Sequence, residues 1–199
     1  RSKANFSFYF GGANDNLDEI RALQPGDCCG VKVFMGASTG NMLVDDPRTL
    51  ELIFAECPTL IATHCEDTPT IKANEERFRQ QYGEDVPFSA HPLIRSEEAC
   101  YKSTVLATTL ARSHGTRLHV LHISTAKELE LFEPGPLITN QGGKRITAEV
   151  CAHMLHFDDR AYATRGALIK CNPAIKTAAD RLALLDGLRD GRLAVIATD

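Results

Sequence analysis

The chain has 199 residues, of which 43% are hydrophobic and 24% charged, and its formal net charge is -4. This length allows one domain with a substantial core, and the composition is that of a folded globular protein rather than a disordered one. The slightly acidic balance gives no electrostatic reason to expect nucleic-acid binding. No apolar run approaches the length of a membrane span and no signal-peptide pattern is present, so we expect neither a membrane nor a nucleic-acid partner.

The cysteines indicate a reducing environment. Their number is odd, their spacing is scattered and no CxxC pair occurs, which argues against a disulfide framework or a structural zinc ribbon. Free cysteine within apolar runs packs as a small hydrophobe. We therefore expect a cytoplasmic location for the protein. The seven cysteines are Cys28, Cys29, Cys57, Cys65, Cys100, Cys151 and Cys171.

Strand-like and helix-like segments alternate along the chain. Strands are predicted over residues 4–10, 30–36, 60–66, 117–124, 146–151 and 193–199. Helices are predicted over 16–23, 47–56, 70–81, 96–114, 127–132 and 177–189, and the segment 155–170 is less regular. Pro47 suits a helix start, Ser96 an N-cap and Gly115 a C-terminal cap.

This alternation argues for an α/β fold with a parallel sheet. Six units in 199 residues give about 33 residues per unit, close to the roughly 31 of a (β/α)8 barrel. We therefore predict a (β/α)8 TIM-like barrel, of which this chain covers roughly strands 3 to 8. An open doubly wound sheet is the alternative, but no GxGxxG follows a strand, so its nucleotide-binding form has no support.

The two ends of the chain do not resemble domain boundaries. The chain starts at Arg1 almost directly before a strand, and it ends at Asp199 with the last strand. Natural domains rarely stop within a strand. We therefore expect residues 1–199 to be part of one longer domain whose N- and C-terminal parts are absent.

Lys32 lies in the middle of the apolar strand Gly30–Gly36. A lysine is almost never fully buried without a partner, and burial lowers its pKa so that the neutral amine becomes accessible. Such an amine can form a Schiff base, act as a general base, or react with CO2 to form a carbamate. A carbamate would turn the cation into an anion that can bridge metal ions.

Polar side chains stand at or near the ends of four different predicted strands: Lys32, His64, His122 and Asp199. In a barrel all four would point toward the mouth where active sites form. A single strand histidine is more often a hydrogen-bonded core residue, and a single buried lysine often pairs with a carboxylate. Two imidazoles, a carboxylate and a carbamate together suit zinc or a similar metal.

Other histidines are weaker candidates. His119 and His122 are three apart on one predicted strand, so alternation puts them on opposite faces. We expect His122 to be the ligand, and His119 to be packed or to support the site from behind the ligands. His153 and His156 would share a face of a helix and could ligate a metal, although a polar helix face is the simpler interpretation. His91 looks like a loop or helix-end residue.

The set of motifs resembles the amidohydrolase superfamily, and within it the dihydroorotases. The motifs are Gly30–Phe34 with the loop Ser38–Asn41, Thr63–Glu66, His119–Thr125, Asn172–Pro173 and Ala197–Asp199. They span nearly the whole chain. The order Lys, His, His, Asp on successive strands is specific to the superfamily, while Asn172–Pro173 and the Ser38–Asn41 loop favour dihydroorotase over its relatives.

The resemblance implies a zinc-dependent cyclic amidohydrolase that interconverts N-carbamoyl-L-aspartate and L-dihydroorotate in pyrimidine (UMP) biosynthesis. In such an enzyme a carboxylated Lys32 and a hydroxide bridge two Zn²⁺ ions, and His64 and His122 bind one of them. Asp199 binds the other and acts as the acid/base, and Asn172 contacts the small-molecule substrate. The family's HxH ligand pair and a substrate-binding arginine do not occur here, so this stretch alone is expected to be inactive. A homodimer is compatible with this interpretation.

Two alternatives stay open. The first is an allantoinase or a dihydropyrimidinase/hydantoinase-type cyclic amidase, which shares the same ligand order. The second is a catalytically silent homologue that acts as a scaffold. Retention of Lys32, His64, His122 and Asp199 together argues against the silent homologue.

Overall fold

The computed structural model describes residues 3–36, 41–139 and 142–199. In these residues, strands β1 (Tyr9–Gly11), β2 (Gly30–Phe34), β3 (Ile61–His64), β4 (Leu118–Val120), β7 (Ile146–Cys151) and β8 (Val195–Ala197) form one sheet. All its neighbouring strands are parallel. The short strands β5 (Ile138–Thr139) and β6 (Gly142–Gly143) form a separate antiparallel hairpin that the sequence did not predict.

The strands follow each other in the sheet in the same order as in the sequence, apart from that hairpin. A doubly wound sheet reverses its strand order at a switch point, and this sheet does not. Sequential parallel neighbours joined by right-handed crossovers place their helices on one face, as in the wall of a barrel. The predicted barrel-type fold is therefore confirmed, and the doubly wound alternative is wrong.

The α-helices in the described residues are α1 (Leu17–Ala22), α2 (Pro47–Glu56), α3 (Thr68–Tyr82), α4 (His91–Ile94), α5 (Glu97–His114), α6 (Ala152–His156), α7 (Tyr162–Arg165) and α8 (Ala178–Arg189). Five of them lie on predicted segments, the predicted helix over 127–132 is a 3₁₀ helix, and the short helices α4, α6 and α7 were not predicted. Short 3₁₀ helices occur at η1 (Phe88–Ala90), η2 (Lys127–Leu131), η3 (Asp159–Ala161) and η4 (Gly166–Ile169). None of the helices in the described residues is long and apolar enough to cross a membrane.

Local sequence signals explain where the long helices begin and end. Asp46 and Ser96 cap α2 and α5 by accepting hydrogen bonds from backbone N–H groups of the first turn. Gly115 ends α5 in the left-handed conformation that glycine adopts without strain. Thr177 and Asp180 form a reciprocal capping box at the start of α8. The N-caps fix where the chain enters α2, α5 and α8, and Gly115 fixes where it leaves α5 for β4.

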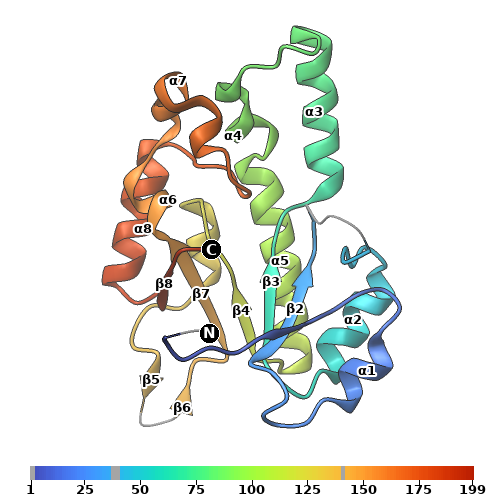
Figure 1. Cartoon of the computed structure of the whole chain (residues 1–199). Coiled ribbons are helices and arrows are strands. Elements are labelled where there is room, and N and C mark those ends of the chain that lie inside the picture. Colours follow the sequence, from blue (N-terminus) through green and yellow to red (C-terminus); the bar gives the residue numbers. More distant parts are fainter. Residues whose placement is uncertain (1–2, 37–40, 140–141) are drawn as a thin grey trace.

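The main core lies between one face of the sheet and the helices. Alternate strand residues such as Val31, Val33, Ile61 and Val120 are fully buried there against helix residues such as Phe54. Figure 1 shows α3, α4 and α7 at the end of the molecule toward which the arrow of β2 points. The carboxyl ends of the strands, which carry the candidate site, therefore open beneath these three helices.

Candidate metal centre

The face of the sheet opposite the main core carries the polar residues. In the register of the sheet, Lys32 pairs with Ala62 and Ala62 pairs with His119, while Phe34 pairs with His64. Residues paired in a parallel sheet point to the same side, so Lys32, His64 and His119 share this inner face. In a barrel this face is the interior that leads to the catalytic mouth.

His64 and His122 meet directly. Nδ1 of His64 lies 3.1 Å from Nε2 of His122, and the two rings are T-shaped with their centroids 4.7 Å apart. Both side chains are buried. The sequence-based expectation that these two histidines come together at the mouth therefore holds in the structure.

The route by which His122 reaches this position differs from the prediction. We expected a strand over 117–124 whose alternation would turn His119 away from the site, but β4 ends at Val120. His122 follows in a left-handed conformation with φ 42°, which changes the direction of its side chain. The alternation argument is thus wrong. His119 also lies on the inner face, where its ring bonds Thr147 and, at 3.0 Å, the carboxylate of Glu149.

The hydrogen bonds around this pair decide which ring nitrogens carry protons. Nε2 of His64 lies 2.9 Å from Oε2 of Glu66, a carboxylate that can only accept, so Nε2 carries the proton and Nδ1 keeps its lone pair. The ring of His122 bonds its own backbone, and burial, His64 and Lys32 hold its pKa well below the usual value. A neutral His122 that donates from Nδ1 presents a second lone pair at Nε2.

Two lone pairs that face each other across 3.1 Å fit a metal ion. Zinc binds imidazole nitrogen at about 2.0–2.1 Å in tetrahedral geometry, which puts two such ligands roughly 3.3 Å apart. Among the described residues, no group of three or more His, Cys, Asp and Glu side chains is arranged around one metal position. The two histidines therefore offer two nitrogen donors at a spacing that a metal ion can use, and Lys32 lies on the same face of the sheet.

Lys32 is half-buried, with its Nζ atom 4.5 Å from the centroid of the Phe34 ring. Burial lowers its pKa from 10.5 to about 8, although the charges of Asp199, Cys65 and Glu149 oppose the shift. At pH 7 about one amine in ten is then neutral, against about one in three thousand for an ordinary lysine. This amine is able to react as the carbamate hypothesis requires.

Asp199 lies two residues beyond β8, is exposed, and has a positive φ of 69°. Its charge acts on Lys32 and also on Cys151, whose pKa burial raises to about 12. Lys32 and Asp199 thus lie within electrostatic range of each other. Asp199 makes no ion pair with any described residue, so its carboxylate is available for other partners.

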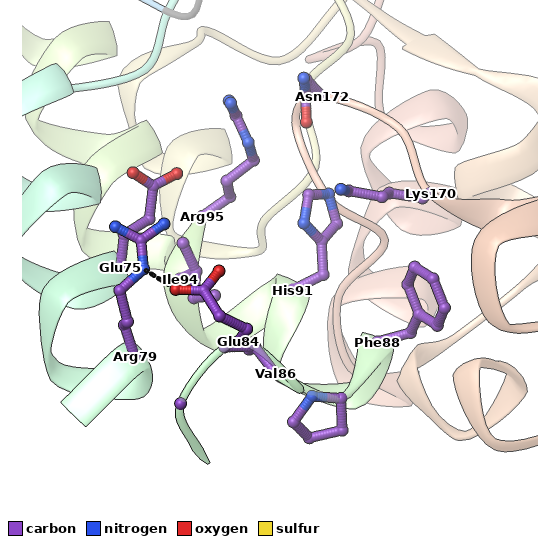
Figure 2. A pocket seen from close by; sticks show the side chains of 12 residues that line it. Glu75, Arg79, Glu84, Val86, Phe88, His91, Ile94, Arg95, Lys170 and Asn172 are labelled. Atoms are coloured by element: carbon purple, nitrogen blue, oxygen red, sulfur yellow. Dashed lines mark ion pairs between the residues drawn. The ribbon is translucent and has the colours of Figure 1, made fainter. Parts of the chain in front are cut away.

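Asn172 lies apart from the histidine pair, on a cavity of about 390 Å³. Figure 2 shows His91, Arg95, Lys170 and Asn172 around one part of this cavity, contributed by α4 and by the segment before α8. The cavity does not contain His64 or His122. It is linked to them because Arg95 donates to the same Glu66 oxygen that His64 contacts. His91 begins α4, in agreement with the prediction of a loop or helix-end residue, and it is buried and bonds the carbonyl of Cys171.

The sequence analysis assigned no role to Glu66 or Arg95, and it gave His153 only as a weaker candidate. Glu66 stands two residues after His64, and this spacing alone could have placed it on the same face. Arg95 gives no comparable signal because its contact spans 29 residues of sequence. Nε2 of His153 is buried without a hydrogen-bond partner among the described residues, and its ring contributes to the lowered pKa of His122.

Three further predictions concern the cysteines, His156 and the Ser38–Asn41 loop. All seven cysteines are free, as expected, and Cys65 packs in the main core. His156 shares α6 with His153, and its ring packs on Phe157. Residues 38–40 of the Ser38–Asn41 loop lie outside the described residues.

No family model matches the chain. An allantoinase of Bacillus velezensis is 28% identical over 203 aligned residues, covering 100% of this chain and 43% of that protein. A dihydroorotase of Anoxybacillus flavithermus is 37% identical over 142 residues, covering 70% of this chain and 30% of that protein. In structure, the L-hydantoinase (dihydropyrimidinase) of Arthrobacter aurescens has a TM-score of 0.86 at 25% identity, covering 100% of this chain and 44% of that one.

These proteins are all cyclic amide hydrolases, so the resemblance inferred from the motifs is confirmed at the level of the branch. The chain spans less than half the length of each of them.

Proposed function

Because the chain is a relative of the cyclic amidohydrolases, we propose that it forms the metal-binding part of an enzyme that hydrolyses a cyclic amide. The observation that carries this proposal is the pair of ring nitrogens of His64 and His122, 3.1 Å apart. Lys32 shares their face of the sheet, and Asp199 lies within electrostatic range of Lys32. Imidazoles, a carboxylate and the carbamate that Lys32 can form with CO2 together suit zinc.

Each residue has a distinct role in the proposed reaction. Lys32, carboxylated on its Nζ atom, would hold the two zinc ions together with His64, His122 and Asp199. When bound, the ions lower the pKa of water and polarise a carbonyl oxygen. Asp199 takes the proton of the attacking water and returns it to the amide nitrogen that leaves.

We propose dihydroorotate as the ring, with N-carbamoyl-L-aspartate as the open form and pyrimidine synthesis as the context. The 37% identity to a dihydroorotase supports this choice. Asn172, which the resemblance assigns to the substrate ring, lines a cavity together with the cations Arg95 and Lys170. Glu75 and Glu84 also line the cavity. Arg95 pairs with Glu66, so Lys170 is the cation that a substrate carboxylate would meet there. The seven free thiols favour the cytoplasm as the location.

Allantoin, hydantoin or dihydropyrimidine rings form the alternative, supported by the allantoinase that matches the whole chain and by the L-hydantoinase structure. The full-length protein, loaded with zinc, should be assayed on dihydroorotate, allantoin, hydantoin and dihydrouracil in parallel. We expect the highest kcat/KM with dihydroorotate. A higher kcat/KM with a neutral ring would identify that ring, rather than dihydroorotate, as the substrate.

The same preparation tests the scaffold alternative by metal analysis. A functional centre predicts two zinc ions per chain and turnover of at least one ring. A full-length protein that binds no zinc and opens none of these rings would be a silent homologue. Sedimentation analysis of the same sample would determine whether the protein forms the homodimer that the resemblance allows.

A further inference from the structure

Glu66 is a buried carboxylate to which the proposed reaction assigns no role. Its side chain is 0% exposed, and its Oε2 atom is shared between Nε2 of His64 at 2.9 Å and Nη1 of Arg95. A carboxylate in the interior is unfavourable unless hydrogen bonds and a counter-charge compensate the loss of water. A residue kept at this cost, in contact with a candidate ligand, calls for a physical explanation.

The direction of the hydrogen bond between His64 and Glu66 explains why a carboxylate is buried here. A carboxylate accepts but does not donate, so contact with Glu66 fixes the proton on Nε2 of His64. The other nitrogen, Nδ1, is then unprotonated and points at Nε2 of His122. Without Glu66 the proton could sit on either nitrogen, and with the proton on Nδ1 the ring could not bind a metal through that atom.

Arg95 supports the carboxylate. Its guanidinium is planar and always charged, and its side chain is only 14% exposed, so it compensates the charge of Glu66 inside the protein. It follows α4 directly, and its backbone N–H bonds the carbonyl of His91 at 2.9 Å. This bond fixes the backbone of Arg95 at the end of α4, and from there its guanidinium reaches Glu66 along the side of the cavity.

We infer that Glu66 and Arg95 are positioning residues that hold His64 with its proton on Nε2, so that Nδ1 is presented to the metal. The inference rests on the proposed function, since it concerns how the chain prepares a metal ligand. Partners of this kind typically change metal affinity by 10- to 100-fold when they are removed.

The first test measures the proton position in the full-length, zinc-free protein by ¹⁵N NMR of the histidine rings. We expect the wild-type His64 signals to be those of the Nε2–H form, and the Glu66→Ala variant to show a mixture of both forms. Glu66→Gln keeps the shape and one acceptor, so it should fold and keep mostly the Nε2–H form. An unchanged Nε2–H form in Glu66→Ala would overturn the inference.

The second test measures zinc affinity by competition with a chelator. We expect affinity to fall about 10- to 100-fold in Glu66→Ala and in Arg95→Met, and to be partly restored in Arg95→Lys. Glu128→Gln is the matched control, because Glu128 is an equally buried glutamate that bonds Thr104 and Thr125 rather than a candidate ligand. An equal loss in Glu128→Gln, or no loss in Glu66→Ala, would contradict the inference.

The two tests separate this inference from the proposed function. If the wild-type protein binds no zinc, the proposed function fails. The NMR measurement still shows whether Glu66 keeps the proton of His64 on Nε2. If the wild-type protein binds zinc and both Glu66→Ala and Arg95→Met bind it equally well, the positioning role alone fails.

Discussion

Gly36 lies directly against the backbone of Glu66, so that a Cβ atom added at Gly36 would stand 1.9 Å from the Glu66 carbonyl oxygen. Real Cβ atoms essentially never approach another atom this closely, and a backbone carbonyl cannot move aside as a flexible side chain could. The segment after β2 and the segment after β3 are therefore locked together at the mouth. This contact joins the Lys32 strand to the His64–Glu66 segment.

We predict that Gly36→Ala destabilises the protein by about 1–3 kcal/mol, since overpacking in a fixed backbone contact costs this much. Chemical denaturation of the full-length protein measures the change. Gly143→Ala is the control, because an added Cβ there meets its nearest atom at an ordinary 3.5 Å. Equal stabilities of the two variants would show that the mouth adapts more easily than its packing indicates.

The lowered pKa of Lys32 predicts unusual reactivity of its amine. Its pKa of about 8 results mainly from burial, and the neutral form therefore gains population as the pH rises through 8. In the zinc-free protein, brief acetylation followed by mass spectrometry should show half-maximal labelling of Lys32 near pH 8. Surface lysines should approach this level only near their ordinary pKa of about 10.4.

Labelling with ¹³CO2 tests whether the neutral amine of Lys32 forms the carbamate. Protein kept under ¹³CO2 with zinc should show a carbamate carbon that is absent in Lys32→Arg, and Lys32→Ala should lose two-metal binding. A Lys32 that labels only at the pH of surface lysines would argue against a reactive neutral amine. Full zinc content and normal turnover in Lys32→Ala would rule out the bridging role.

The elements of the fold were predictable because local signals specify them. Apolar runs marked five of the six parallel strands, whereas the first was predicted over 4–10 and begins only at Tyr9. The caps at Asp46, Ser96 and Thr177 agree with helix starts found from sequence to within two residues. The sheet order was only implied by the regular alternation, and the register shown by the structure decided it. The β5–β6 hairpin has just two residues in each strand and gives no periodic signal.

The candidate site was predictable only where a residue type stood out from its strand. Lys32 and His64 are polar residues in apolar runs, and both lie on the inner face as expected. His122 depends on a left-handed backbone turn that no strand pattern encodes. Arg95 depends on a contact across the fold, which only the packing of α4 against the mouth creates. Long-range polar contacts of this kind have no periodicity for a sequence reading to detect.

Asp199 is predicted to carry the proton transfer of the proposed reaction. Asp199→Asn keeps the size of the side chain and an oxygen ligand but removes the base, so kcat should fall by at least about 100-fold while KM changes little. Steady-state kinetics and metal analysis of the full-length variant measure both effects. Asp190→Asn is the control, because Asp190 pairs with Arg192 at the surface away from the inner face. Near-normal kcat in Asp199→Asn would assign the acid/base role to another residue.

Lys170 is predicted to favour substrates that carry a carboxylate. It lines the cavity beside Asn172, and no carboxylate among the described residues pairs with its amine. An exposed charge contributes up to about 1 kcal/mol, which corresponds to a factor of about five in affinity. Lys170→Met should therefore raise KM for dihydroorotate up to about fivefold and leave KM for an uncharged ring unchanged.

Salt provides an independent check on this charge effect. Exposed charges are screened within about 10 Å at 0.1 M ionic strength, so the difference between wild type and Lys170→Met should shrink as salt is added. Lys102→Met is the control, since Lys102 pairs with Glu98 on α5 outside the cavity. A KM change that is equal for charged and neutral rings, or that salt does not reduce, would mean that Lys170 acts through the shape of the cavity rather than through its charge.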